Sequence, residues 1–207
     1  MAARRVERKA RCGRSMGVAL PPAAVGAHGV PMLPDSFRTA RLVLQPIAPE
    51  DAGPIFDAYA QDAEVTRFLT WRPHRSRGDT ETYIAHCAAT PADAARTYVL
   101  IGREDGAVRG AFDLRREGPH RLGFGYVLAR PWWGRGLVSE ALSEVAGWAL
   151  AQPPVFRFGA VCDVENPASA RVMEKAGLAR EGVLRRWLVH PNLGGEPRDC
   201  FSYARAR

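Results

Sequence analysis

Hydrophobic residues recur along the chain in two patterns, which predict strands where they alternate or run together and helices where they return every three or four positions. The predicted strands lie at 41–46, 97–102, 107–114, 122–128, 155–161, 183–189 and 200–204. The predicted helices begin near residues 49, 63, 79, 137 and 166. Antiparallel hairpins come first and a β-α-β-α-β-β order follows. We therefore expect a single α+β domain with a mixed sheet, rather than a doubly wound parallel fold.

Two turns in this pattern are specific. Asp105-Gly106 predicts a tight hairpin between the second and third strands. The polar run 115–121 predicts a loop between the third and fourth strands.

The centre of the pattern is the stretch 124–145, which reads as strand, glycine turn and helix. The strand ends at Arg130-Pro131, because proline has no N–H to give to a ladder. Gly134-Arg135-Gly136 follows, and a glycine turn at a helix start presents unpaired N–H groups to an anion. Two interpretations stay open here: a phosphate site, or an ordinary connection that needs glycine for its turn. The helix that follows has one apolar face, made of Val138, Ala141, Leu142, Val145, Ala146 and Ala149.

Two familiar phosphate motifs do not fit this turn. GxxxxGK[ST] is absent from the chain, which excludes a P-loop nucleotidase. GxGxxG fails at its third glycine, where Ser139 stands. Asp163 ends the next strand, where a ribose-binding acid would be expected, but the hairpins upstream do not repeat the βαβ unit that a dinucleotide domain needs.

Composition and charge divide the chain into a tail, 1–34, and a globular domain, 35–207. With 46% hydrophobic and 25% charged residues among 207, the chain is typical of globular proteins. The tail has no helical or strand period, and it holds six basic residues against Glu7 alone, which is +5 of the net charge of +7. We expect it to be flexible or a start-site artefact; a basic arm for nucleic acid or membrane, and a targeting peptide, are the alternatives.

The cysteines and histidines give no sign of a metal site or a disulfide framework. No CxxC pair occurs, no histidine stands at metal spacing, and no apolar run approaches the length of a membrane span. We expect a cytoplasmic protein with no metal, no membrane and no nucleic-acid partner. The four cysteines are scattered at Cys12, Cys87, Cys162 and Cys200.

A second segment carries a family resemblance, which decides between the two interpretations of the glycine turn. Asn166 and Ser169, the run Glu174-Lys175-x-Gly177, and Glu181-Gly182 follow the turn at a fixed separation. Together these motifs resemble the GNAT superfamily of acetyl-CoA-dependent N-acetyltransferases, in the branch of the ribosomal-protein acetyltransferases RimJ and RimL. The resemblance runs from Phe37 to the C-terminus. It departs at Pro131, where the family usually has arginine or glutamine, and at Leu178, where the branch usually has phenylalanine.

The resemblance implies a GNAT fold, with a mixed, mostly antiparallel sheet that splays at the cofactor site and is flanked by helices. It implies acetyl-CoA as co-substrate. The pantetheine arm would run along Val127, Leu128 and Ala129, and Asn166 and Ser169 would hold it from the second helix. The pyrophosphate would lie on the turn and the helix start, at Gly134, Arg135, Gly136, Leu137, Val138 and Ser139.

The implied reaction is direct attack of a primary amine on the thioester. A backbone N–H, that of Val127 or Leu128, would stabilise the oxyanion, and we assign it to Leu128. Ser169 would give a proton to the departing thiolate, where many relatives have tyrosine; its alternative role is an ordinary helix-surface or capping hydroxyl. Asn166 is also a favoured helix cap. Four side chains are candidate general bases, and no position in the sequence singles out one of them: Asp113, Tyr126, Asp163 and His74.

The amine acceptor is the part of the implied reaction that the sequence specifies least. Trp71 and Arg72 lie in an early loop, and with Tyr126 they are the substrate-side candidates, because loops carry specificity on a rigid scaffold. The acceptor is expected to be a protein N-terminus, a ribosomal protein or a small amine, and the protein a monomer or homodimer. The alternatives are a catalytically degenerate fold that binds acyl-CoA or a partner, and nucleic-acid binding through the tail.

Overall fold

The computed structural model describes residues 32–207, so the predicted tail lies outside the described residues except for its last three positions. Leu33 is 1% exposed and belongs to the hydrophobic core. The carbonyl of Pro34 accepts a hydrogen bond of 2.7 Å from the Tyr98 hydroxyl. The packed domain therefore reaches back to Leu33.

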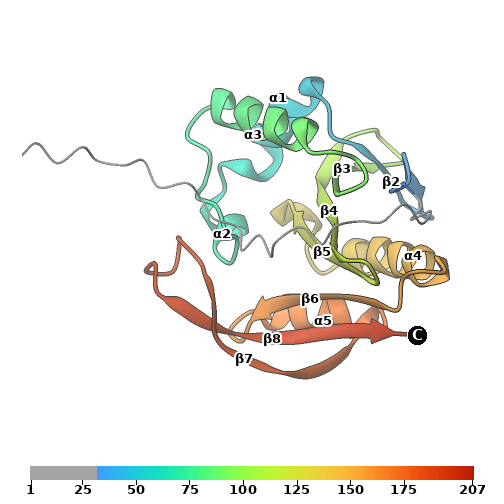
Figure 1. The fold of residues 1–207 in the computed structure, drawn as a ribbon. Coiled ribbons are helices and arrows are strands. Elements are labelled where there is room, and N and C mark those ends of the chain that lie inside the picture. Colours follow the sequence, from blue (N-terminus) through green and yellow to red (C-terminus); the bar gives the residue numbers. More distant parts are fainter. Residues whose placement is uncertain (1–31) are drawn as a thin grey trace, which may run out of the picture.

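The described residues form one eight-stranded mixed sheet in the order β1-β2-β3-β4-β5-β6-β8-β7 (Figure 1). All neighbouring strands pair antiparallel except β5 and β6, which are parallel. The predicted fold class is confirmed. The strands are β1 (Phe37–Arg38), β2 (Leu42–Pro46), β3 (Ala95–Gly102), β4 (Val108–Gly118), β5 (Arg121–Leu128), β6 (Arg157–Asp163), β7 (Ala179–Val189) and β8 (Pro197–Ala206).

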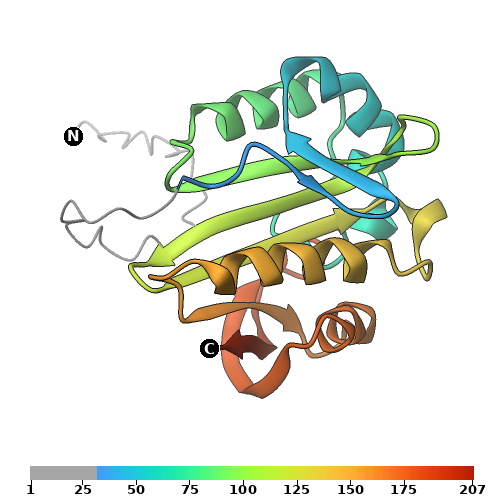
Figure 2. The same cartoon turned by 90° about the vertical axis from the view of Figure 1, so that its right-hand side faces the viewer.

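Helices cover both faces of the sheet. Figure 2 shows α1 and α3 on one side of the strands and α4 on the other. None of the helices within 32–207 is long and apolar enough to cross a membrane. The helical segments are η1 (Pro49–Asp51), α1 (Ala52–Ile55), η2 (Phe56–Ala60), α2 (Ala63–Thr66), α3 (Arg77–Ala89), η3 (Arg130–Trp132), α4 (Leu137–Ala151) and α5 (Pro167–Lys175).

Two hydrophobic clusters, one on each face, follow from the alternation of side chains along the central strands. The first cluster packs Phe112 and Phe124 against α4 and α5, and the rings of Phe124 and Phe158 stack at 4.7 Å. The second cluster packs Ala111 and Ala129 against α1 and η2. Every residue of the predicted apolar face of α4 is buried, which confirms that face.

The parallel pair β5–β6 is short, and this feature positions the site. Only Arg121–Gly123 of β5 pairs with β6, at Arg157–Gly159. Beyond Gly123, β5 stays on β4 up to Leu128, whereas β6 follows β8 up to Asp163. We call the unpaired stretch between 124–128 and 160–163 the wedge.

The predicted turns had mixed outcomes. The Asp105-Gly106 hairpin is confirmed: β3 and β4 pair antiparallel across it, and Gly106 has φ of +69°. The loop expected at 115–121 is wrong, because β4 continues to Gly118 with Arg115 opposite Gly123 and Arg116 opposite Leu122. Its arginine side chains are polar, but strand pairing uses the backbone.

Candidate active site

The backbone of β5 forms one wall of the wedge. The N–H of Ala129 donates to the Arg109 carbonyl at 2.7 Å, so the backbone N–H and C=O groups of Ala129 point toward β4. In an antiparallel pair the hydrogen-bonding residues alternate. Val127 therefore faces β4 as well, while the N–H and C=O groups of Tyr126 and Leu128 point toward β6. Of the three consecutive residues predicted to hold the pantetheine arm, this geometry leaves Leu128 directed at the wedge.

Trp133 occupies one of the two backbone groups of Leu128. Its indole N–H donates to the Leu128 carbonyl at 2.7 Å, although the ring is 46% exposed. The carbonyl is thus engaged within the protein. The Leu128 N–H is then the strand donor at the end of β5 that suits an incoming oxyanion.

The glycine turn opens α4 with backbone groups alone. Gly134 and Gly136 both have φ of +74°, in the left-handed region that favours glycine. Gly136 is the N-cap of α4 and has no side-chain capping bond, and the first helical bond runs from the Glu140 N–H to the Gly136 carbonyl at 3.1 Å. The N–H groups of the residues before Glu140 have no acceptor within their own helix. These are three of the predicted pyrophosphate donors: Leu137, Val138 and Ser139.

The space above this turn suits a ligand. Apart from Gly134 and its two chain neighbours, no atom of residues 32–207 lies within 4 Å of where a Gly134 Cβ would stand, so that position is open. Arg135 lies with its guanidinium 4.6 Å from the centre of the Trp132 ring. Unpaired N–H groups at a helix start, with arginine beside them, fit the pyrophosphate of coenzyme A.

Arg41, which sequence reasoning missed, contacts the turn from a segment that lies 94 positions earlier in the sequence. Its Nη1 donates to the Arg135 carbonyl at 2.9 Å, and its Nε lies 2.6 Å from Glu140 Oε2. Burial alone would raise the pKa of Glu140, but hydrogen bonds from Thr39 and Arg41 outweigh it, so the pKa is lowered. The carboxylate therefore stays ionised and holds Arg41 in place. No local signal in the sequence pairs residues 94 positions apart.

Helix α5 supplies the second wall. The Asn166 Oδ1 accepts the Ser169 N–H at 3.1 Å, and Pro167 stands in the first turn. Asn166 is thus the cap of its helix, as one of its two predicted roles requires.

Ser169 and Tyr126 meet across the wedge. The Tyr126 hydroxyl lies 2.7 Å from Ser169 Oγ and 3.3 Å from the Ser169 carbonyl. Burial raises the pKa of Tyr126 far above its ordinary value, so the phenol keeps its proton. The side chain of Tyr126 packs with the cluster on the α4 and α5 face, whereas Trp71 packs with the other cluster. The three predicted substrate-side residues are therefore not together.

The acceptor-side loop joins distant parts of the chain. Trp71 and Arg72 lie between α2 and α3, and the Trp71 ring is 4.9 Å from that of His74. Asn192, in the turn between β7 and β8, donates from Nδ2 to the carbonyls of Thr66 (2.7 Å) and Trp71 (2.8 Å). Sequence reasoning missed Asn192 because it lies 121 positions beyond Trp71.

Three of the four candidate bases are engaged in structural contacts. Asp163 is fully buried and bound by the Arg198 guanidinium at 2.6 Å. Burial would raise the Asp163 pKa, but bonds from Arg198 and the Glu165 N–H lower it overall, so it is a poor proton acceptor at neutral pH. Asp113 pairs with Arg115 at 2.6 Å, and His74 Nδ1 lies 2.8 Å from Thr80 Oγ1. Burial lowers the His74 pKa.

His190, which no sequence pattern marked, lies beside Asp163. It is 2% exposed, and its Nε2 is 3.5 Å from Asp163 Oδ2. Burial lowers the pKa of His190 despite the nearby carboxylate. The ring is therefore neutral at neutral pH. Within 32–207, no three His, Cys, Asp or Glu residues form a group that could hold a metal ion.

Comparisons with known proteins show which family this chain matches. The family model for the acetyltransferase (GNAT) domain matches residues 41–179. The uncharacterized N-acetyltransferase YoaA of Bacillus subtilis (strain 168) is 30% identical over 173 residues, which are 81% of this chain and 94% of YoaA.

Solved structures share the fold at lower identity. A GNAT-family acetyltransferase from Bacillus anthracis superposes with a TM-score of 0.73 at 23% identity, covering 83% of this chain and 98% of that one. RimL, the ribosomal L7/L12 alpha-N-protein acetyltransferase in complex with coenzyme A, superposes with a TM-score of 0.70 at 19% identity, covering 85% and 98%.

Proposed function

Because the chain belongs to the GNAT acetyltransferase family, we propose that it moves an acetyl group from acetyl-CoA to a primary amine by direct attack on the thioester. The observation that carries this proposal is the wedge between β5 and β6. The Leu128 backbone lies on one wall, Ser169 lies on the other, and the glycine turn opens α4 beside them.

Acetyl-CoA would bind along the wedge. Its pyrophosphate would accept hydrogen bonds from the backbone N–H groups at the start of α4, and Arg135 would add a side-chain charge. Its pantetheine arm would run along the end of β5, from the glycine turn toward Leu128. This leaves the thioester carbonyl at the end of β5, next to the Leu128 N–H.

Each group at the wedge would then have one task. The amine nitrogen attacks the thioester carbonyl carbon, and the Leu128 N–H stabilises the oxyanion, a contribution typically of about 10²–10³ in rate. As the C–S bond breaks, Ser169 Oγ gives its proton to the departing thiolate. The Tyr126 hydroxyl, hydrogen-bonded to that same Oγ, would relay back to it the proton that the attacking amine releases, so that both hydroxyls end the step protonated. The amine must arrive neutral, or lose its proton to water.

The acceptor is proposed to be an exposed amine, either a protein N-terminus or a small molecule. RimL, whose fold is shared, is described as an alpha-N-protein acetyltransferase. A catalytically degenerate protein that binds acyl-CoA without turnover is the competing function, and it predicts binding without release of the thiol.

Release of free coenzyme A from acetyl-CoA, measured against a panel of amines and N-terminal peptides, tests the proposal. Ser169→Ala is expected to lower kcat about 100-fold and Tyr126→Phe about tenfold, once a pre-steady-state experiment shows that chemistry limits the rate. Ser143→Ala is the matched control, because its hydroxyl bonds within α4 to the Ser139 carbonyl at 2.8 Å. Unchanged kcat in Ser169→Ala would exclude Ser169 as the proton donor. Binding of acetyl-CoA with no turnover on any amine would favour the degenerate protein.

A further inference from the structure

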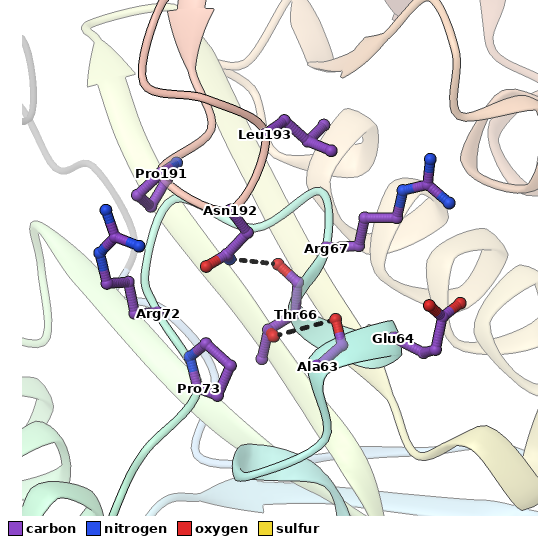
Figure 3. Close-up of a pocket in the computed structure, with 9 residues that line it drawn as sticks. All are labelled: Ala63, Glu64, Thr66, Arg67, Arg72, Pro73, Pro191, Asn192 and Leu193. Atoms are coloured by element: carbon purple, nitrogen blue, oxygen red, sulfur yellow. Dashed lines mark hydrogen bonds between the residues drawn. The ribbon is translucent and has the colours of Figure 1, made fainter.

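A pocket of about 410 Å³ lies on the acceptor side (Figure 3). Its walls come from α2 and the loop after it, and from the turn at 191–193 between β7 and β8. Asn192 lies in this turn and fastens it to the Thr66 carbonyl, which Figure 3 marks with a dashed line. The pocket is thus a built junction of two segments and not a fold in a single loop.

Both segments are tied to the strand ends that bound the wedge. At the end of β5, Arg130 pairs at 2.9 Å with Asp62, the N-cap of α2. At the end of β6, the Asp163 carboxylate lies 3.5 Å from His190, which precedes the turn. The pocket therefore lies near the carboxyl ends of β5 and β6, where the acetyl group would be offered.

Two arginines give the pocket its charge. Figure 3 shows the side chains of Arg67 and Arg72 on opposite sides of Asn192. Neither guanidinium has a carboxylate within 4.0 Å among the residues from 32 onward, whereas many arginines elsewhere in the domain are paired. Arg67 lies over the Phe68 ring at 5.3 Å. The single acid that lines the pocket is Glu64.

We propose that this pocket binds a carboxylate of the acceptor, so that the preferred substrates are primary amines that also carry an acidic group. A guanidinium presents N–H donors in a fork that matches a carboxylate, and an unpaired one can accept it without first breaking an ion pair. Glu64 lowers the positive charge of the pocket, which favours a singly charged carboxylate over a chain of phosphates. The carboxylate is the α-carboxylate of a free amino acid or the acidic side chain of a peptide near its N-terminus. This inference rests on the proposed acetyl transfer.

Charge-matched acceptor pairs test it in the full-length protein. One pair is an amino acid and its α-amide; the other is a peptide with Asp and one with Asn at the second position. We expect kcat/KM to favour the acidic member of at least one pair about tenfold or more, because a hydrogen bond to a charged group is worth that much. The pair that shows the preference identifies the source of the carboxylate.

Variants locate the effect. Arg67→Gln and Arg72→Gln are expected to remove most of the preference while the Kd for acetyl-CoA stays within twofold of the unmodified protein. Arg75→Gln is the matched control, since Arg75 lies in the same loop and is not among the residues that line the pocket. Equal kcat/KM for acid and amide in both pairs would overturn the inference, as would a preference that survives in both variants.

Calorimetric titration of the same pairs separates this inference from the proposed function. If no amine is acetylated at all, acetyl transfer fails, yet the titration still decides whether the acidic member binds more tightly through Arg67 and Arg72. Equal binding of acid and amide would then overturn the pocket assignment.

Discussion

The glycine turn and the pocket beside Asn192, which we propose serve the two substrates, are built in opposite ways. The turn takes its donors from the backbone of one short run, Gly134 to Ser139. The pocket is assembled from side chains and turns 121 and 126 positions apart, which Asn192 holds together. A backbone site depends on φ angles and helix geometry, whereas a side-chain site depends on where the fold brings each residue.

This difference bears on what each region can specify. Backbone N–H groups would bind the part of acetyl-CoA that is the same in every reaction cycle, so their site can be built without side-chain chemistry. The acceptor region instead varies its side chains on a fixed frame, and loops are where such variation is tolerated. The comparison predicts that changes in the turn affect acetyl-CoA, and changes around Asn192 affect the amine.

The largest effect is expected from Gly136→Glu. A side chain at φ of +74° strains the backbone, and a carboxylate beside the N–H groups of α4 competes with the pyrophosphate. The Kd for acetyl-CoA, measured by calorimetry, is expected to rise about 30-fold. Gly147→Glu adds the same charge in the interior of α4, where no positive φ is required, and it is expected to leave the Kd unchanged. Equal affinities in the two variants would show that the turn does not hold the pyrophosphate.

Asn192→Ala is expected to have a smaller effect, which falls on the amine and not on acetyl-CoA. Two carbonyls, of Thr66 and Trp71, lose their donor, at a cost of about 1–3 kcal/mol in stability or local order. We expect KM for the amine to rise about tenfold while the Kd for acetyl-CoA is unchanged. Gln152→Ala removes a similar hydrogen bond from a side-chain amide, between Gln152 Nε2 and the Trp148 carbonyl at 2.9 Å, at the far end of α4. If both variants shift KM alike, the effect is a general loss of stability and the comparison fails.

The smallest effect is expected from pH, through His190. Burial lowers its pKa in the folded protein below the value in the unfolded chain, near 6.5. The folded state then binds the proton less readily, so its stability is complete above about pH 6.5 and falls as the pH drops below that value. The melting temperature between pH 7.5 and 5.5 measures this fall, and His190→Phe is expected to reduce it. His74→Phe is the comparison for a second, half-buried imidazole, whose pKa is also lowered. An identical pH slope in His190→Phe would exclude His190 as the source.

Much of the fold was predictable because its signals are local. The apolar face of α4, the Asp105-Gly106 hairpin and the order of strands and helices all follow from spacing and turn chemistry within a few residues. The error at 115–121 has the same origin. Arginines at Arg115 and Arg116 suggested a loop, but the partner strand that keeps β4 extended is defined only by pairing with β5.

The sequence by itself determined the strand, glycine turn and helix at 124–145, together with the cap at Asn166, because φ sign, capping and helical period are properties of adjacent residues. Only the tertiary structure decided that Leu128 and not Val127 faces the wedge, since that depends on the register of β5 against β4. It also decided the contact of Tyr126 with Ser169 and the anchoring of the acceptor turn by Asn192. Such contacts form where packing brings distant segments together, and no spacing along the chain encodes them.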